Sequence, residues 1–206
     1  MTLPKAMIVL LLVLCCALPA AMAQAPGPEE QVTRLNQGLL QSMHGGAKLG
    51  LQGRYKILAP VIDQTFALPL MARTAAGRFW AEMDPSQQKS YLDKYREWTI
   101  TSYASNFDAF HNESFSPPEL PKPADHIADV VSTFTTQDGK KVVFDYRMVR
   151  SGAGWLIADI RVDGVSQLAL TRTQFVEVLE KKGVAGLLAS IDEKIAKLTG
   201  GRAPGQ

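Results

Sequence analysis

Apolar side chains recur at helical spacing through residues 55–83. The apolar positions of this stretch are Ile57, Leu58, Val61, Ile62, Phe66, Leu70 and Met71. Pro60 and Pro69 interrupt the pattern, and proline starts or kinks a helix because it fixes φ and removes a backbone donor. The stretch therefore predicts several short helices rather than one long helix.

Residues 84–87, Asp-Pro-Ser-Gln, predict the start of the next helix, because an N-cap acceptor is followed by proline at the first helical position and by Gln three residues after the cap. Tyr91, Tyr95 and Trp98 then follow at i, i+4 and i+7, which places three aromatic rings on one helix face. Such stripes are most often ordinary core, and spacing alone does not separate core from the wall of a cavity.

Alternating positions predict three strands in the second half of the chain. The four prolines of residues 116–123 favour an extended connector, and the first strand covers about residues 127–136, before an Asp138-Gly139 hairpin signal. The inward positions of the next two strands are expected to be Val142, Phe144, Tyr146 and Met148, then Leu156, Ala158, Ile160 and Val162. The pattern predicts an antiparallel meander with one buried face.

Helical periodicity returns after a turn at residues 164–166, Gly-Val-Ser. Residues 171–174, Thr-Arg-Thr-Gln, offer a capping box, and Gly183 is expected to end the helix that follows. A last helix is predicted over residues 187–198. Helices, then a meander, then helices predict an α+β fold in which an antiparallel β-meander is packed on one face by several helices. This arrangement can enclose an apolar pocket.

The first 23 residues have the form of a cleavable secretory signal peptide: a basic start at Lys5, an apolar run over residues 6–18, and an Ala-Met-Ala site at residues 21–23. The run is shorter than the roughly 20 residues that span a bilayer. We expect residues 24–200 to form a single domain and residues 201–206 to be a disordered tail. Both cysteines, Cys15 and Cys16, lie in the signal, so the mature chain is expected to have neither a disulfide nor a thiol nucleophile.

Charge argues against nucleic acid as a partner. Removing Lys5 from the 22 basic residues leaves 21 against 20 acidic residues, and no basic run stands out. His44, His111 and His126 are widely separated, so no metal site is predicted, and no phosphate-binding loop or dinucleotide motif implies a cofactor.

No residue pattern predicts catalysis. Ser166 lacks the second glycine of a nucleophile elbow, which favours a turn or helix-cap role. Asp145, Asp159 and Asp163 fall on the polar side of their strands, where we expect them to pair with Lys141, Arg147 and Arg161 rather than to act as bases.

Several segments resemble, in order, the MlaC and toluene-tolerance family of periplasmic lipid carriers. In the front half they are residues 61–64 (VIDQ), 68–71 (LPLM), 84–92 (DPSQQKSYL) and 95–97 (YRE). In the back half they are the GVS turn at residues 164–166 and residues 182–187 (KGVAGL), within the stretch 155–187. Residues 166–175 (SQLALTRTQF) further resemble the hopanoid-associated HpnM branch.

The resemblance implies a periplasmic carrier that holds the apolar part of a phospholipid or hopanoid between sheet and helices. It also implies exchange of that lipid with inner-membrane and outer-membrane transport complexes; we expect the carrier to be a monomer. The residues we predict to contact lipid are Val61, Phe66, Leu70, Met71, Tyr95, Trp98, Val142, Phe144, Tyr146, Ile160, Val165 and Phe175. Two alternatives stay open: a small α+β enzyme with Asp145 or Asp159 as base, and an adaptor with a fully packed interior.

Overall fold

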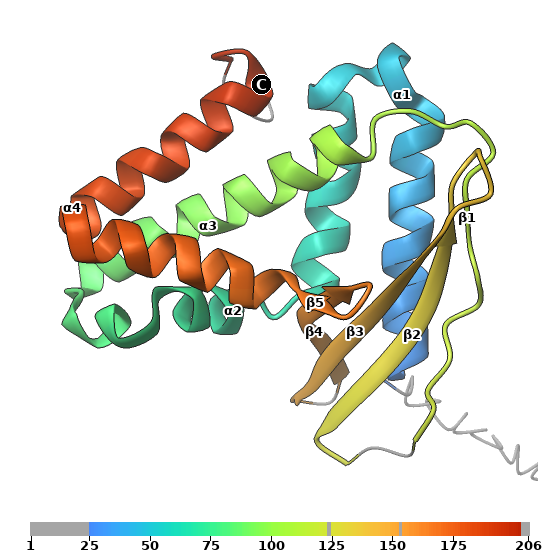
Figure 1. The fold of residues 1–206 in the computed structure, drawn as a ribbon, viewed down its shortest axis with the longest axis horizontal. Coiled ribbons are helices and arrows are strands. Elements are labelled where there is room, and N and C mark those ends of the chain that lie inside the picture. The colour runs from blue at the N-terminus through green and yellow to red at the C-terminus, as the bar shows by residue number, and fades with distance from the viewer. Residues whose placement is uncertain (1–24, 123–124, 153, 203–206) are drawn as a thin grey trace, which may run out of the picture.

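The computed structural model describes residues 25–122, 125–152 and 154–202. The predicted signal peptide lies outside these residues, as do residues 203–206 of the predicted tail. Five antiparallel strands form one sheet in the order β1-β2-β3-β4-β5, and the helices form a second layer (Figure 1). The predicted α+β class, with a meander and helices, is confirmed.

Helix α1 (Pro28–Thr65) is a hairpin of two helical legs rather than one rod (Figure 1). Gly46 (φ 46°) and Gly50 (φ 61°) break the helix between the legs, in a backbone region that favours glycine. The buried Arg54 holds this turn, because its Nε donates to the carbonyl of Ala104 at 2.7 Å and its Nη1 to that of Gly46 at 2.7 Å. The legs touch at Gly38, where a Cβ would lie 2.9 Å from Cγ1 of Val61.

Three helical segments continue the chain as predicted: α2 (Leu68–Ala76), the short 3-10 helix η1 (Gly77–Glu82) and α3 (Pro85–Asn106). The predicted capping box at Asp84 is present, since its carboxylate accepts from the amides of Ser86 and Gln87. Tyr91 and Tyr95 are buried and Trp98 is half-buried. Helix α3 packs against both α1 and α4.

The sheet contains the three predicted strands, β2 (Ile127–Thr135), β3 (Lys141–Ser151) and β4 (Gly154–Val162), and two short ones, β1 (Ser114–Phe115) and β5 (Val165–Ser166). Ion pairs cover the outer face, where Asp129 contacts Arg147 at 3.0 Å and Arg161 at 2.7 Å. Asp145 meets Arg161 at 2.9 Å, as expected. Asp159 and Asp163 form no arginine or lysine pair within the described residues, so the expected pairing is wrong for them.

The predicted face of β4 is wrong in its first half because the strand contains a bulge. Tyr146 pairs with Ile160, yet Met148 pairs with Ile157, so one extra residue of β4 lies between these pairs. Ile157 is fully buried on the core side, whereas Leu156 pairs with Val149 and is half-buried. The one-residue shift places the side chains before the bulge on the face opposite to the one that strict alternation predicts.

Helix α4 (Gln167–Thr199) begins four residues earlier than the predicted capping box. Ser166 is its N-cap and accepts from the amide of Ala169 at 2.9 Å, as its expected cap role requires. Thr171 is inside the helix and donates to the carbonyl of Gln167. Gly183 (φ 64°) breaks the helix at the predicted place, and Gly200 caps its end. Beyond this cap, the amide of Gly201 donates to the carbonyl of Ala196 at 2.9 Å.

Candidate functional site: a cavity between the sheet and helices α3 and α4

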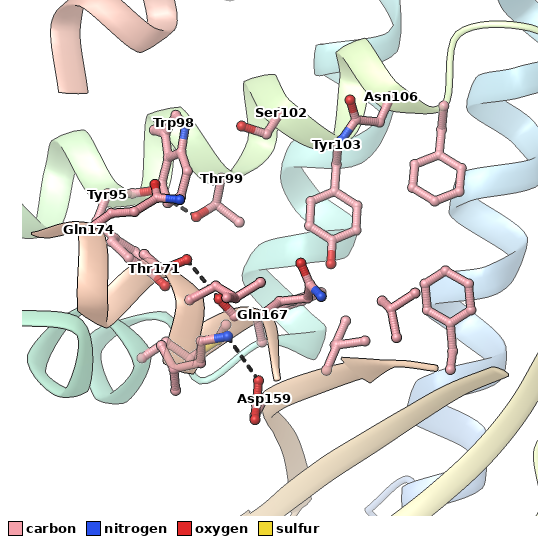
Figure 2. Close-up of a pocket in the computed structure, with 18 residues that line it drawn as sticks. Tyr95, Trp98, Thr99, Ser102, Tyr103, Asn106, Asp159, Gln167, Thr171 and Gln174 are labelled. Carbon is pink, nitrogen blue, oxygen red and sulfur yellow. Dashed lines mark hydrogen bonds between the residues drawn. The ribbon is translucent and has the colours of Figure 1, made fainter. Parts of the chain in front are cut away.

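A cavity of about 470 Å³ lies where α3 and the start of α4 pass over β3 and β4 (Figure 2). Its volume lies within the range of small-molecule sites, about 300–1,000 Å³.

The sheet and the first helices supply an apolar floor. Phe66 lies at the junction of α1 and α2, where the amide of Ala67 donates to the carbonyl of Ile157 on β4 at 2.8 Å. This bond fixes the ring of Phe66 at the edge of the sheet, 5.5 Å from the ring of Tyr103. The other apolar and aromatic lining residues are Met71, Tyr95, Trp98, Phe107, Phe144, Ile160, Val162, Leu168 and Leu170.

The hairpin between β4 and β5 places the start of α4 over the cavity. Asp163 (φ 48°) and Gly164 (φ 83°) take the left-handed conformations of a tight two-residue turn. Asp159 then holds the helix start, because its Oδ1 accepts from the amide of Leu168 at 3.1 Å and its Oδ2 from Oγ of Ser166 at 2.6 Å. The carboxylate also lines the cavity.

Burial keeps the tyrosines around this site protonated. Desolvation raises the pKa of Tyr95, and the phenol of Tyr103 and the carboxylate of Asp159 add to that effect. Desolvation likewise raises the pKa of Tyr103, again with a contribution from Asp159. Both phenols are therefore neutral hydrogen-bonding groups at physiological pH.

Six of the twelve predicted contact residues line the cavity: Phe66, Met71, Tyr95, Trp98, Phe144 and Ile160. They come from α2, α3, β3, β4 and the junction of α1 and α2, and the fold brings them together. Lipid contact by these side chains stays a prediction.

Two of the other predicted residues, Tyr146 and Phe175, are buried in the core instead. The hydroxyl of Tyr146 donates to Oδ1 of Asn36 at 3.1 Å, which ties β3 to the first leg of α1. Phe175 lies in an aromatic cluster with Tyr91, Tyr95 and Trp98, with ring centroids 5.4–6.3 Å away. Packing partners on a second element, which the sequence does not reveal, decide both positions.

The remaining four predicted residues also lie outside the cavity lining. Val61 faces Gly38 across the two legs of α1. Val142 is half-buried on β3 opposite Phe134. Leu70 is 44% exposed on α2, and Val165 is 50% exposed in the turn before α4.

The sequence prediction missed the polar part of the lining: Thr99, Ser102, Tyr103, Asn106, Asp159, Gln167, Thr171 and Gln174. A signal for some of them was present, since Thr99, Ser102 and Asn106 extend the Tyr95 face of α3 at helical spacing. Apolar periodicity does not identify these residues, because their side chains are polar.

The described residues contain neither a helix long and apolar enough to cross a bilayer nor a cluster of three or more metal-ligating side chains. The chain thus has the architecture of an α+β protein whose helices cover one face of an antiparallel sheet and leave a cavity above it.

Comparison with known proteins agrees with this architecture. Residues 33–193 match the model of the MlaC protein family, so the chain belongs to that family. A solved structure of a phospholipid-binding protein from Ralstonia solanacearum, in complex with a phospholipid, matches with a TM-score of 0.74 and 27% sequence identity. The match covers 84% of this chain and 99% of that one.

Proposed function

We propose that this protein is a lipid carrier of the periplasm, which binds the apolar part of a phospholipid or hopanoid in the cavity between α3, α4 and the sheet. The observation that carries the proposal is a cavity of about 470 Å³ lined largely by aromatic and aliphatic side chains, in a fold shared with a phospholipid-bound protein. Transfer of a chain from water to such walls contributes about 0.8 kcal/mol for each buried methylene.

The carrier works without catalysis, as a monomer that exchanges lipid with transport complexes of the inner and outer membranes. A secretory signal at residues 1–23 is the sequence feature that supports its export. The cavity counts against a purely structural adaptor, for which a fully packed interior was expected.

An enzyme that uses Asp159 as a base is the second candidate, because Asp159 lines the cavity. Its two oxygens, however, accept hydrogen bonds from Leu168 and Ser166 and hold the start of α4. The other candidate base, Asp145, lies on the outer face of the sheet against Arg161. These contacts favour structural roles for both carboxylates.

The test is organic-solvent extraction of the purified protein followed by mass spectrometry, together with uptake of labelled lipid from vesicles. We expect about one lipid molecule in each protein molecule. Thr171→Trp fills the cavity from α4 and should abolish uptake, whereas Thr173→Trp, an exposed position of the same helix, should not. A wild-type protein that carries no lipid and takes none from vesicles refutes the proposal.

A further inference from the structure

Helices α3 and α4 face each other across the cavity with uncharged hydrogen-bonding side chains (Figure 2). We call this set the polar seam. It consists of Ser102, Tyr103 and Asn106 from α3 and Gln167, Thr171 and Gln174 from α4. The α4 members fall at i, i+4 and i+7, so one face of the helix carries all three.

The polar seam has hydrogen-bonding capacity to spare. Within the described part of the chain, the side chains of Ser102 and Asn106 and the hydroxyl of Tyr103 donate to no protein group and accept from none. The Tyr103 ring extends from α3 toward the start of α4 (Figure 2). On α4, Nε2 of Gln167 donates to the carbonyl of Val165 at 3.0 Å, which leaves its Oε1 as an acceptor. Such groups gain free energy when an oxygen-bearing ligand meets them.

The same wall is poorly suited to an anion because no cationic side chain lines it; the nearby Lys194 donates from outside the lining to Oε1 of Gln174 at 3.5 Å. The lining residues include no lysine, arginine or histidine, and their one charge is the carboxylate of Asp159. A helix N-terminus attracts anions through its free amides. At α4, Asp159 accepts from the amide of Leu168, and Ser166 accepts from that of Ala169. The protein's own groups therefore already bond these two amides, and the charge of Asp159 repels an anion.

We propose that the polar seam binds uncharged oxygen-bearing groups of the lipid, either hydroxyls or ester carbonyls, and excludes anionic groups at that depth. The inference rests on the proposed function, since it concerns which lipids the same cavity accepts. A phospholipid meets this condition when its ester carbonyls lie at the seam and its phosphate stays in solvent. A lipid with a polyol group meets it with hydroxyls.

The first experiment compares two probes that share a twelve-carbon chain, monolauroylglycerol and laurate, by isothermal titration calorimetry at pH 8. We expect the uncharged glycerol ester to bind on the order of tenfold more tightly, because it gains one or two neutral hydrogen bonds and avoids Asp159. Asp159→Asn should reduce this difference in affinity, mainly because laurate should bind more tightly to the variant.

The seam is tested directly by the double variant Ser102→Ala with Asn106→Leu. The variant should bind monolauroylglycerol on the order of tenfold more weakly, whereas its affinity for laurate should stay within about twofold of the wild-type value. Ser105→Ala is the matched control, because Ser105 lies on the same helix outside the lining and should change neither affinity. A measurement on the wild-type protein alone compares uptake of a diester phosphatidylcholine with uptake of its diether analogue. The diester should be taken up to a greater extent, because the diether lacks the ester carbonyls.

Equal affinity for both probes, or tighter binding of laurate, overturns the inference and leaves the proposed carrier function standing. The same holds if the diether lipid is taken up as well as the diester. Failure of the wild-type protein to bind either probe or any vesicle lipid instead refutes the carrier function, and the inference with it.

Discussion

The two sides of the helical layer meet the sheet in different ways. Against α1, the sheet forms a closed interface, which we call the packed half: Leu35, Leu39, Leu58 and Ile62 from the helix, and Val130, Tyr146, Met148 and Ile157 from the sheet, are all 0–1% exposed. Against α3 and the start of α4, the sheet leaves the cavity, which we call the open half.

Neighbouring positions of one strand show what separates the halves. Tyr146 and Phe144 lie two residues apart on β3, and their rings stack with centroids 6.1 Å apart. Tyr146 is tied to Asn36, which itself donates to Oγ of Ser132 at 3.3 Å, whereas Phe144 lines the cavity. The packed half therefore provides rigidity, and the open half leaves free the surface that a ligand would need.

A leucine-to-alanine substitution should lower stability most in the packed half. Leu58→Ala removes a fully buried side chain of α1 and should lower the free energy of unfolding by about 2–5 kcal/mol. Leu168→Ala, at the half-buried wall of the open half, should cost less than about 1 kcal/mol and weaken lipid uptake instead. Denaturant unfolding and vesicle uptake measure the two effects. Equal destabilisation by both variants would contradict the distinction.

Removal of one phenol hydroxyl gives a finer comparison. Tyr146→Phe leaves Oδ1 of the buried Asn36 without its donor and should cost about 1–3 kcal/mol of unfolding free energy. Tyr103→Phe removes a hydroxyl that bonds to no described protein group, so stability should change by less than about 0.5 kcal/mol. Thermal and denaturant unfolding measure the stability of the two variants. A larger loss for Tyr103→Phe would show that its hydroxyl has a structural role.

The N-caps of α3 and α4 provide a third test, because only one of them borders the cavity. Ser166→Ala and Asp84→Ala each remove a cap and should cost about 0.5–2 kcal/mol. Only Ser166→Ala should also change the rate of lipid uptake, since it loosens the helix start above the cavity. Stopped-flow transfer from labelled vesicles measures that rate. A similar change for Asp84→Ala would mean that general destabilisation controls uptake.

The smallest effect is expected on the outer face of the sheet. The hydrogen bond from Arg147 holds the pKa of Asp129 below its ordinary value, and the charge of Arg161 acts in the same direction. A lowered pKa means that the pair stabilises the fold above the unfolded-state pKa of about 3.9 and loses this contribution as pH falls through the folded-state pKa. Asp129→Asn should therefore cost less than about 1 kcal/mol at pH 7, because the pair is partly exposed.

The measurement for this variant is urea unfolding of wild type and Asp129→Asn from pH 7 to pH 2.5. The difference between them should vanish at the acid end. Asp93→Asn is the control, because it removes an exposed pair with Lys89 on α3 and should change stability little at any pH. A difference for Asp129→Asn that grows on acidification would contradict the assigned direction.

Periodicity predicted the elements well where the local signal and the packing agree. The capping box at Asp84, the meander and the break at Gly183 follow from residue types within a few positions of each other. It failed at β4, where the bulge between the Tyr146 and Met148 pairs shifts the face of the strand. A bulge depends on how two strands align, and one strand does not encode it.

The candidate site was predicted in part for a related reason. Apolar spacing selected six residues that line the cavity: Phe66, Met71, Tyr95, Trp98, Phe144 and Ile160. It also selected Val61, which packs on Gly38, and Leu70, which is exposed. A buried side chain on a core stripe and one on a cavity wall have the same periodicity. What separates them is whether a second element approaches closely enough to fill the space.

The sequence by itself determined the fold class, the family resemblance and the positions that turn inward on each helix, because these follow from patterns along the chain. Only the tertiary structure decided that α1 closes over one part of the sheet while α3 and α4 leave a cavity over the other. It also decided that Asp159 accepts from the start of α4 and that the residues of the polar seam line one cavity. The physical reason is that cavities and caps arise where elements distant in the sequence meet, and their spacing depends on the packing of the whole chain.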